Sequence, residues 1–348
     1  MVLQLVLSIV GLALLYFGAE WLVEGSSRLA LRFGISPLII GLTVVAFGTS
    51  SPELLVCLQA NMTKPPLEGG AFVLGNILGS NIYNIALILA IGALIRPINI
   101  SRQIIVREVP ILIGAVLLLI WFLQDQRLSR TEGGIFFAGL LAFLLFSGIT
   151  SAKQMREKRD AAKEEKSEAE ESPVWKSIFL IVAGLGALIF GSNLLVESAT
   201  RLATLLGVSP ALISLTLVAF GTSVPELATV VVASMKNQGD IITGNVIGSN
   251  IFNVLAILGI TALVRPVVYS TQDVHALELY YMAGITILLL PLLMTRRWLS
   301  RGEGMLLLAS CMVYLYFLYQ QHAPGKQASQ NNSGPTSAAR LAEPALIF

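Results

Sequence analysis

Ten stretches of at least sixteen residues in this 348-residue chain contain no Asp, Glu, Lys or Arg. A helix needs about 20 mainly apolar residues to cross the hydrocarbon core of a bilayer. The alternating pattern of a membrane β-barrel is absent from these stretches, so each one predicts a transmembrane helix. We therefore expect an all-α membrane protein with ten transmembrane helices. The stretches are 1–19, 33–52, 69–95, 109–124, 133–152, 177–196, 202–225, 241–264, 279–295 and 304–325.

Charged residues make up only 13% of the chain, whereas soluble domains carry roughly 25%. This composition cannot supply the polar surface that a water-soluble enzyme of this length needs. It also argues against nucleic acid as a partner, because a nucleic-acid-binding protein needs a basic surface and the net charge is only +2. The partner that the composition implies is the lipid bilayer of a cell membrane.

Two hydrophilic segments divide the chain. Residues 153–176, which include KQMREKRDAAKEEKSEAEE, predict a charged, solvated linker that is helical in part. Residues 321–348 are rich in Gly, Ser, Asn and Pro and predict a mostly disordered tail. The remaining segments, 1–152 and 177–320, hold five predicted helices each. Lys and Arg gather in the loops on the side of the linker, so we expect a cytoplasmic linker and both termini outside.

The two halves of the chain repeat one another. LTVVAFGTSSPE (Leu42–Glu53) and LTLVAFGTSVPE (Leu215–Glu226) are identical at ten of twelve positions. GNILGSNIYN (Gly75–Asn84) and GNVIGSNIFN (Gly244–Asn253) agree at seven of ten. Because each half crosses the membrane an odd number of times, we predict two five-helix repeats of inverted topology. This architecture is typical of secondary transporters that bind substrate near the bilayer midplane; a duplication that only built a scaffold is the alternative.

Glu53 and Glu226 stand at the end of the first repeated segment. Each follows at least twenty residues without charge, so each is predicted to lie deep in the membrane. A charge there costs several kcal/mol, and none of the ten stretches contains a Lys or Arg that could pair with it. One explanation is a permanently protonated glutamate that donates a hydrogen bond. The explanation we favour is a carboxylate neutralised by a bound cation.

Pro52 and Pro225 precede the two glutamates. Because proline has no N–H, the carbonyls of Gly48 and Gly221 lose their helical donors, and each helix is predicted to break. Irregular backbone inside a membrane is tolerated where it lines a cavity, so the freed carbonyls and nearby hydroxyls are expected to face one. These hydroxyls belong to Thr49, Ser50, Thr222 and Ser223.

Polar side chains form a stripe in the second repeated segment. Asn76, Ser80 and Asn84 are spaced by four residues and therefore share one helical face. The second half repeats the stripe in Asn245, Ser249 and Asn253. Such residues often serve only as hydrogen-bonding links between helices. A duplicated stripe beside two buried glutamates favours a binding site.

The donor atoms of this predicted site are oxygens. Oxygen ligands without imidazole select hard cations such as Ca²⁺ and Na⁺. Two carboxylates without a bound ion are costly in a medium of low dielectric, so the unloaded protein should resist switching sides. One Ca²⁺ or two Na⁺ would neutralise them and lower that barrier, which is the behaviour of an exchanger. We predict no cofactor beyond the transported ions.

The GTSSPE/GTSVPE and GSNIYN/GSNIFN pairs resemble the two alpha-repeats of the cation/calcium exchanger superfamily, in particular its bacterial and archaeal sodium/calcium antiporters. The resemblance covers roughly residues 1–320. It implies a secondary active antiporter that exchanges Ca²⁺ for Na⁺ by alternating access and extrudes Ca²⁺, with helices one and six sliding across a fixed core. It implies that Ca²⁺ is held by Glu53 and Glu226 together with backbone oxygens of Ala46, Thr49, Ala219 and Thr222. It places Na⁺ ligands at Ser50, Ser80, Ser223, Ser249, Asn84 and Asn253.

Some family members carry Asp at the place of Asn253, so the ion stoichiometry and the involvement of H⁺ or K⁺ stay open. Exchange of H⁺ for Ca²⁺ or another divalent cation is the main alternative, because burial favours a protonated carboxyl group. A cation channel is a further alternative. An intramembrane enzyme is disfavoured, since no predicted span has a His in its core. Glu24 and Glu197, at matching places near the ends of helices one and six, are predicted to be solvated at the interface, with gating as the alternative.

Overall fold

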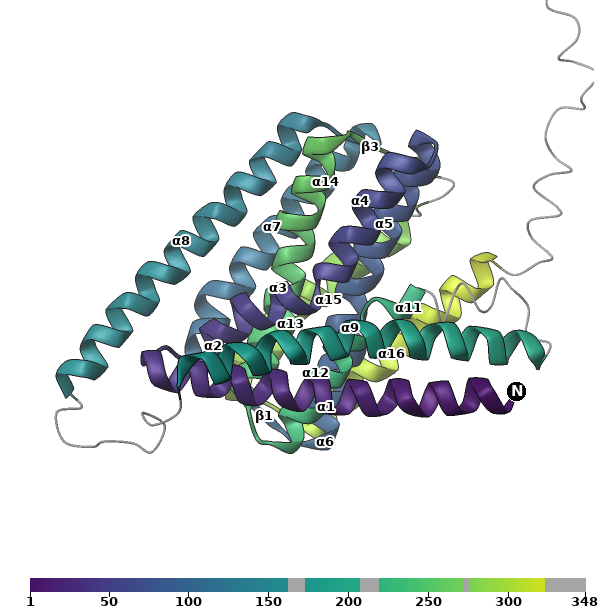
Figure 1. The fold of residues 1–348 in the computed structure, drawn as a ribbon. Coiled ribbons are helices and arrows are strands. Elements are labelled where there is room, and N and C mark those ends of the chain that lie inside the picture. Colours follow the sequence, from purple (N-terminus) through teal and green to yellow (C-terminus); the bar gives the residue numbers. More distant parts are fainter. Residues whose placement is uncertain (162–172, 207–218, 272–273, 275, 323–348) are drawn as a thin grey trace, which may run out of the picture.

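The computed structural model is almost entirely helical over the residues that it describes (Figure 1). The predicted tail beyond His322 and residues 162–172 of the predicted linker lie outside the described part of the chain. The described residues are 1–161, 173–206, 219–271, 274 and 276–322.

The first half contains one long helix, one broken helix and three further spans. Its helices are α1 (Val2–Phe33), α2 (Pro37–Ile40), the π-helical turn η1 (Gly41–Val45), α3 (Ala46–Thr49), α4 (Ser51–Thr63), α5 (Pro66–Tyr83), the π-helical turn η2 (Asn84–Ile88), α6 (Leu89–Ile95), the π-helical turn η3 (Ile104–Glu108), α7 (Val109–Phe122), the 3₁₀ turn η4 (Leu123–Asp125) and α8 (Arg130–Ala161). The first nine residues of the predicted linker thus continue α8, in keeping with a linker that is helical in part.

The second half follows the same order. Its helices are α9 (Val174–Leu205), α11 (Ala219–Gly221), α12 (Val224–Met235), α13 (Gly239–Phe252), the π-helical turn η7 (Asn253–Leu258), α14 (Gly259–Val264), α15 (Ala276–Arg296) and α16 (Arg301–His322). The short strands are β1 (Ile98–Asn99), β2 (Arg127–Leu128), β3 (Val267–Val268) and β4 (Trp298–Leu299).

Within the described residues, eight helices are long and apolar enough to cross a membrane, and a bent pair of helices makes a ninth candidate. These nine lie where nine of the ten helices are predicted. The tenth, predicted over 202–225, includes residues 207–218, which lie outside the described part of the chain. The chain is therefore a mostly helical, multi-pass membrane protein.

Two of these spans form the centre of the molecule. In the continuous span α5–η2–α6, 78% of the apolar window is buried, and in α13–η7–α14 the figure is 89%, against 22% for α1. Both central spans carry the repeated Asn and Ser stripe. The polar stripes therefore lie inside protein, where side chains from other helices surround them.

Glycines bring the central span of the second half against the broken helix of the first. A Cβ added to Gly244 would lie 2.6 Å from the carbonyl oxygen of Leu38, and one added to Gly248 would lie 2.8 Å from that of Leu42. Only glycine fits at such distances, because real side chains need more space. This close crossing of α13 with α2 and η1 brings Asn245, between the two glycines, to the break in the helix.

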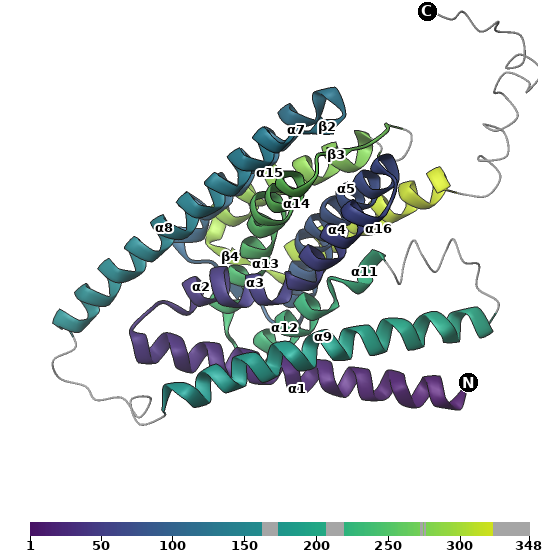
Figure 2. The ribbon, with the colours of Figure 1, turned by 45° about the horizontal axis from the view of Figure 1, so that its top comes forward.

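Helices α1 and α9 lie side by side and antiparallel, as a layer against the remaining helices (Figures 1 and 2). A Cβ on Gly18 would lie 2.9 Å from the carbonyl oxygen of Gly184, and one on Gly184 would lie 2.7 Å from that of Gly18. Gly11 and Gly191 make the same reciprocal contact. The two long helices, one from each half, therefore pack backbone against backbone.

The short strands also join the two halves. Strand β1 pairs with β4 and β2 pairs with β3, both antiparallel. The helix after β2, α8, begins with a capping box. The Ser129 hydroxyl accepts from the Glu132 N–H, and the Glu132 carboxylate accepts from the Ser129 N–H. Ser300 and Glu303 repeat this arrangement at the start of α16.

Candidate functional site

The two predicted glutamates lie in the first turns of equivalent helices. Glu53 belongs to α4 and Glu226 to α12, and each side chain is 1% exposed. The predicted helix breaks are confirmed: α3 ends at Thr49 and α4 begins at Ser51, with a bend of 41° between the two arms. In the second half, α11 ends at Gly221 and α12 begins at Val224. Proline fits the first turn of the new helix, because an N–H in that turn would have no partner within the helix.

The carboxylates of Glu53 and Glu226 are close enough to repel each other. The hydroxyl of Ser50 donates to Oε1 of Glu226 at 3.1 Å, so a residue beside one break contacts the glutamate of the other half. Thr222 likewise lies next to the Glu53 carboxylate, and Thr49 lies next to that of Glu226. The two helix breaks thus face each other across the centre of the protein.

The central asparagines meet the same breaks from the side. The Thr49 hydroxyl donates to Oδ1 of Asn245 at 3.2 Å, and the Thr222 hydroxyl donates to Oδ1 of Asn76 at 3.3 Å. Each bond joins one half to the other. The polar stripe of each central span is therefore hydrogen-bonded to the broken helix of the opposite half.

Asn84 and Asn253 are held by a second reciprocal pair of hydrogen bonds. The Asn84 amide donates to Oδ1 of Asn250 at 3.0 Å, and the Asn253 amide donates to Oδ1 of Asn81 at 3.0 Å. The π-helical turns η2 and η7 begin at Asn84 and Asn253. A π-helical turn inserts an extra residue and is frequent at functional sites. With their nitrogens engaged, both asparagines keep their oxygens free.

Several buried oxygens at this centre have no hydrogen-bond partner among the described residues. Buried polar atoms are normally paired, and an unpaired one costs about 1–3 kcal/mol. These unpaired oxygens include one from each carboxylate, and they are therefore available to bind a cation. No group of three or more His, Cys, Asp or Glu able to hold a metal occurs in the described residues. The unpaired oxygens are Glu53 Oε2, Glu226 Oε2, Asn84 Oδ1, Asn253 Oδ1 and Ser249 Oγ.

The other predicted ligands lie in the same region. The Ser223 hydroxyl donates to that of Ser80 at 3.3 Å, which again joins the halves. The Ala46 carbonyl accepts from the Ser50 N–H at 3.0 Å and from the Thr49 hydroxyl at 3.4 Å. Ala219 is the first residue of α11. Of the predicted ligands, the broken helices carry the carboxylates, the backbone oxygens and the hydroxyls of Ser50 and Ser223, and the central spans carry the amides and the hydroxyls of Ser80 and Ser249.

One prediction about the backbone is wrong. The Gly221 carbonyl lacks its helical donor, but the expectation that it is free to face a cavity fails, because the hydroxyl of Ser192 on α9 donates to it at 2.9 Å. The comparison of the two repeats does not identify Ser192, because the matching position in α1 is Ala19. The requirement for a donor at a proline break was the only signal in the sequence that could have revealed it. Helix α9 is therefore tied directly to the broken helix of its own half.

The glutamates of α1 and α9 form ion pairs away from the centre. Glu24 pairs with Arg28, and Glu197 pairs with Arg201, in both cases one helical turn apart. All four side chains are at least 36% exposed, in keeping with the predicted interfacial solvation. Glu20 pairs with Lys236, at the end of α12, at 2.9 Å.

The fold and the buried, two-carboxylate centre define a class of membrane transport proteins. The sequence pattern of the family described as "Sodium/calcium exchanger protein" matches residues 3–149 and 176–320. The chain belongs to this family of exchangers, whose members are transporters rather than enzymes. The two matched segments coincide with the two predicted repeats.

Several relatives match over almost the whole chain. The putative antiporter CaxA of Alkalimonas amylolytica is 38% identical over 314 residues, which cover 89% of this chain and 97% of the relative. The inner membrane protein YrbG of Escherichia coli is 36% identical, covering 92% and 98%. The sodium/calcium exchanger MaX1 of Methanosarcina acetivorans is 30% identical, covering 89% and 97%.

A solved structure shares the fold. The sodium/calcium exchanger from Methanococcus jannaschii superposes with a TM-score of 0.74 and 29% sequence identity, covering 90% of this chain and 98% of that one. The arrangement of helices described above is therefore that of an exchanger of this family.

Proposed function

We propose that this protein exchanges Ca²⁺ for Na⁺ across the membrane by alternating access, with the ions bound between Glu53 and Glu226. The observation that carries the proposal is the set of buried, unpaired oxygens contributed by both halves. Ca²⁺ takes about 6–8 oxygen ligands at 2.3–2.6 Å, drawn from carboxylates, carbonyls and amides. The two carboxylates, with Asn84, Asn253 and Ser249, supply ligands of this kind without nitrogen or sulfur.

We assign the remaining predicted ligands to the same site. The hydroxyls of Ser50 and Ser223 and the backbone oxygens at the breaks flank the carboxylates, and the relative MaX1 is named a sodium/calcium exchanger. Na⁺ also prefers oxygen ligands, so overlapping use of these groups makes binding of the two ions exclusive. The full assigned set is Glu53, Glu226, Ala46, Thr49, Ser50, Ser80, Asn84, Ala219, Thr222, Ser223, Ser249 and Asn253.

The proposed topology has ten transmembrane helices in two inverted repeats. The contacts support it, because they come in reciprocal pairs: Thr49 with Asn245 and Thr222 with Asn76 exchange the roles of the two halves. The strand pairs are reciprocal in the same way. Strand β1, after the third span, pairs with β4, and its counterpart β3, after the eighth span, pairs with β2. Such reciprocity is the pattern expected of a pseudo-two-fold axis in the membrane plane.

Exchange follows from the charge of the site. Two carboxylates without a bound ion resist crossing between sides, because their charge is costly in low dielectric. One Ca²⁺ or two Na⁺ removes that charge, so the protein changes sides only when it is loaded. We place the linker in the cytoplasm and both termini outside. We expect the inward Na⁺ gradient of a cell to drive extrusion of Ca²⁺.

The test is uptake of radiolabelled Ca²⁺ into proteoliposomes loaded with Na⁺, at fixed pH, against liposomes without a Na⁺ gradient. We expect uptake only when Na⁺ leaves in exchange. Uptake that ignores Na⁺ and follows an imposed pH gradient would replace the proposal with H⁺/Ca²⁺ exchange. Single-channel current steps in planar bilayers would identify a channel instead.

A further inference from the structure

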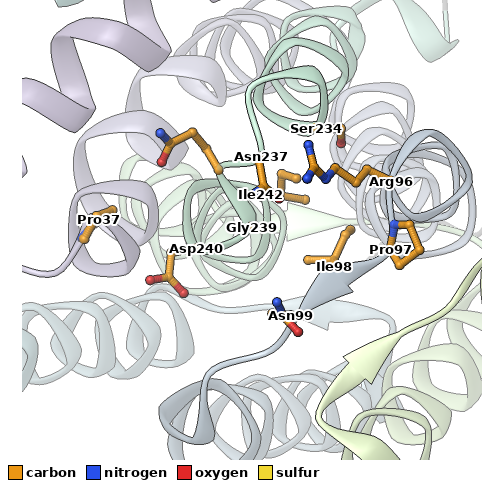
Figure 3. Close-up of a pocket in the computed structure, with 11 residues that line it drawn as sticks. Pro37, Arg96, Pro97, Ile98, Asn99, Ser234, Asn237, Gly239, Asp240 and Ile242 are labelled. Carbon is orange, nitrogen blue, oxygen red and sulfur yellow. The ribbon is translucent and has the colours of Figure 1, made fainter.

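A polar cavity of about 230 Å³ lies away from the site between the glutamates (Figure 3). Its walls are the end of α6 with strand β1, the loop between α12 and α13, and the start of α2. These are ends of predicted spans, at the level where a bilayer meets water. The polar residues used below are Arg96, Asn99, Ser234, Asn237 and Asp240.

The role of Arg96 is clarified by its repeat counterpart, Arg265. The guanidinium of Arg265 donates to the carbonyl oxygens of Asn61 at 2.7 Å and Lys64 at 3.2 Å, at the end of α4. Two prolines follow Lys64. Because proline has no N–H, the chain itself cannot cap these last carbonyls, and the arginine replaces the missing donors.

In the second half the chain caps its own helix. The N–H of Gln238 donates to the Ala233 carbonyl at 2.8 Å, and that of Asn237 donates to the Ser234 carbonyl at 3.2 Å. Asn237 takes the left-handed conformation, with φ of 57°, that such a cap requires. Arg96 is consequently released from the capping role. Its exposed guanidinium makes no hydrogen bond or ion pair within the part of the chain that the structure describes.

Ser234 provides the second observation. It lines the same cavity, is 1% exposed, and its hydroxyl has no hydrogen-bond partner among the described residues. The residue at the matching place in the first half, Asn61, donates to the carbonyl oxygens of Arg265 and Thr261. The replacement by serine leaves a shorter side chain, a cavity and an unused donor beside a free guanidinium.

We propose that this cavity binds a phosphate ester group, with the phosphate on Arg96 and Ser234. A guanidinium forms two parallel hydrogen bonds with phosphate oxygens, and a hydroxyl and the amides of Asn99 and Asn237 add neutral donors. Figure 3 shows Asp240 on the opposite side of the cavity from Arg96. Asp240 already interacts with another part of the chain, so the charge that stays available in the cavity is the positive charge of Arg96, which suits an anion. The group belongs either to a phospholipid headgroup or to a soluble phosphate ester, and phosphatidylethanolamine and phosphoethanolamine serve as probes of the two.

The test uses the full chain, purified in detergent and stripped of lipid, with binding followed by isothermal titration calorimetry. The probes are dihexanoyl-phosphatidylethanolamine, free phosphoethanolamine, and dihexanoylglycerol, which lacks the phosphate. We expect the lipid, the free phosphoethanolamine or both to bind, and dihexanoylglycerol not to bind. Binding of the lipid alone identifies a lipid headgroup as the ligand, and equal binding of both identifies a soluble phosphate ester.

Arg96→Gln should weaken binding about tenfold or more, because a charged hydrogen-bonding partner is lost. Arg102→Gln, which removes another exposed positive charge, one that does not line the cavity, should leave binding within about twofold of wild type. Arg96→Lys and Ser234→Ala should each give an intermediate loss, and they decide the matter if Arg96→Gln does not fold. The absence of binding by both phosphate probes, equal binding of dihexanoylglycerol, or wild-type binding by Arg96→Gln would overturn the proposal.

Discussion

The centres of the two halves are nearly alike, whereas the ends of the same helices differ. At the centre, Thr49 and Thr222 each donate to an asparagine of the opposite half, at 3.2 and 3.3 Å. At the ends, α4 needs Arg265 as a cap, and α12 is capped by its own backbone. The centres face each other, so a change in one must fit the other. The ends face apart and are free to diverge.

The centre also departs from symmetry in the hydrogen bonds of its paired serines. Ser50 donates to Glu226, but its counterpart Ser223 donates to Ser80 rather than to Glu53. The two glutamates therefore have different hydrogen-bonding surroundings in this conformation. Inverted repeats in one conformation take two different local structures, and alternation of access exchanges them.

The largest effect is expected at the two glutamates. Glu53→Gln and Glu226→Gln each remove half of the negative charge that a divalent cation needs, so we expect Na⁺-driven Ca²⁺ uptake to fall by about a hundredfold or more. Glu68→Gln is the matched control, because Glu68 is exposed at the start of α5. Exchange at the wild-type rate in either central variant would disprove the site.

Alanine substitutions on either side of the contact between α1 and α9 should lower the stability of the protein by similar amounts. A Cβ at Gly18 or Gly184 would meet backbone of the partner helix at 2.9 or 2.7 Å, so Gly18→Ala and Gly184→Ala should each destabilise the protein by about 1–3 kcal/mol. Thermal unfolding in detergent measures this. Gly186→Ala is the control, since nothing lies within 4 Å of its added Cβ and the substitution favours a helix. Equal stability of all three variants would argue against close packing.

The asymmetry of the serines predicts a smaller effect. Ser50→Ala removes a hydrogen bond to a carboxylate and should weaken the apparent affinity for Ca²⁺ about tenfold. Ser223→Ala removes only a bond between two hydroxyls and should weaken it about threefold or less. The measurement is the Ca²⁺ concentration that gives half-maximal uptake in proteoliposomes. The reverse order would mean that the opposite conformation dominates in the membrane.

The smallest expected effect concerns the helix ends. Arg265→Gln leaves the carbonyls of Asn61 and Lys64 without their donor and should cost about 0.5–1 kcal/mol of stability, because water can partly replace the donor there. Arg96→Gln should cost nothing measurable in protein stripped of lipid, because Arg96 caps no helix. Paired unfolding curves in detergent test the difference, and similar losses in both variants would contradict the divergence of the two ends.

Much of the architecture could be predicted because bilayers impose simple rules. Uncharged stretches located nine spans that the structure bears out, and proline after Gly-Thr-Ser located the helix breaks before Glu53 and Glu226. Duplication supplied the rest: residues repeated beside a buried charge are expected to lie beside it in the fold. All twelve predicted ligand residues fall within the described part of the chain.

Other features depend on contacts that no local pattern encodes. The π-helical turns that begin at Asn84 and Asn253 arise where helices pack around the centre, and their sequences read as ordinary helix. Ser192, which donates to the Gly221 carbonyl, has an alanine as its repeat counterpart. The different roles of Arg96 and Arg265 follow from the residues after α4 and α12, far away in the sequence.

The most direct measurement is equilibrium binding of radiolabelled Ca²⁺ to the purified protein in detergent, with Na⁺ as competitor. If the unpaired oxygens between Glu53 and Glu226 form one shared site, Na⁺ should displace Ca²⁺ competitively, and Glu53→Gln and Glu226→Gln should each abolish Ca²⁺ binding. Ca²⁺ binding that is indifferent to Na⁺ and survives both substitutions would contradict a shared site between the two halves.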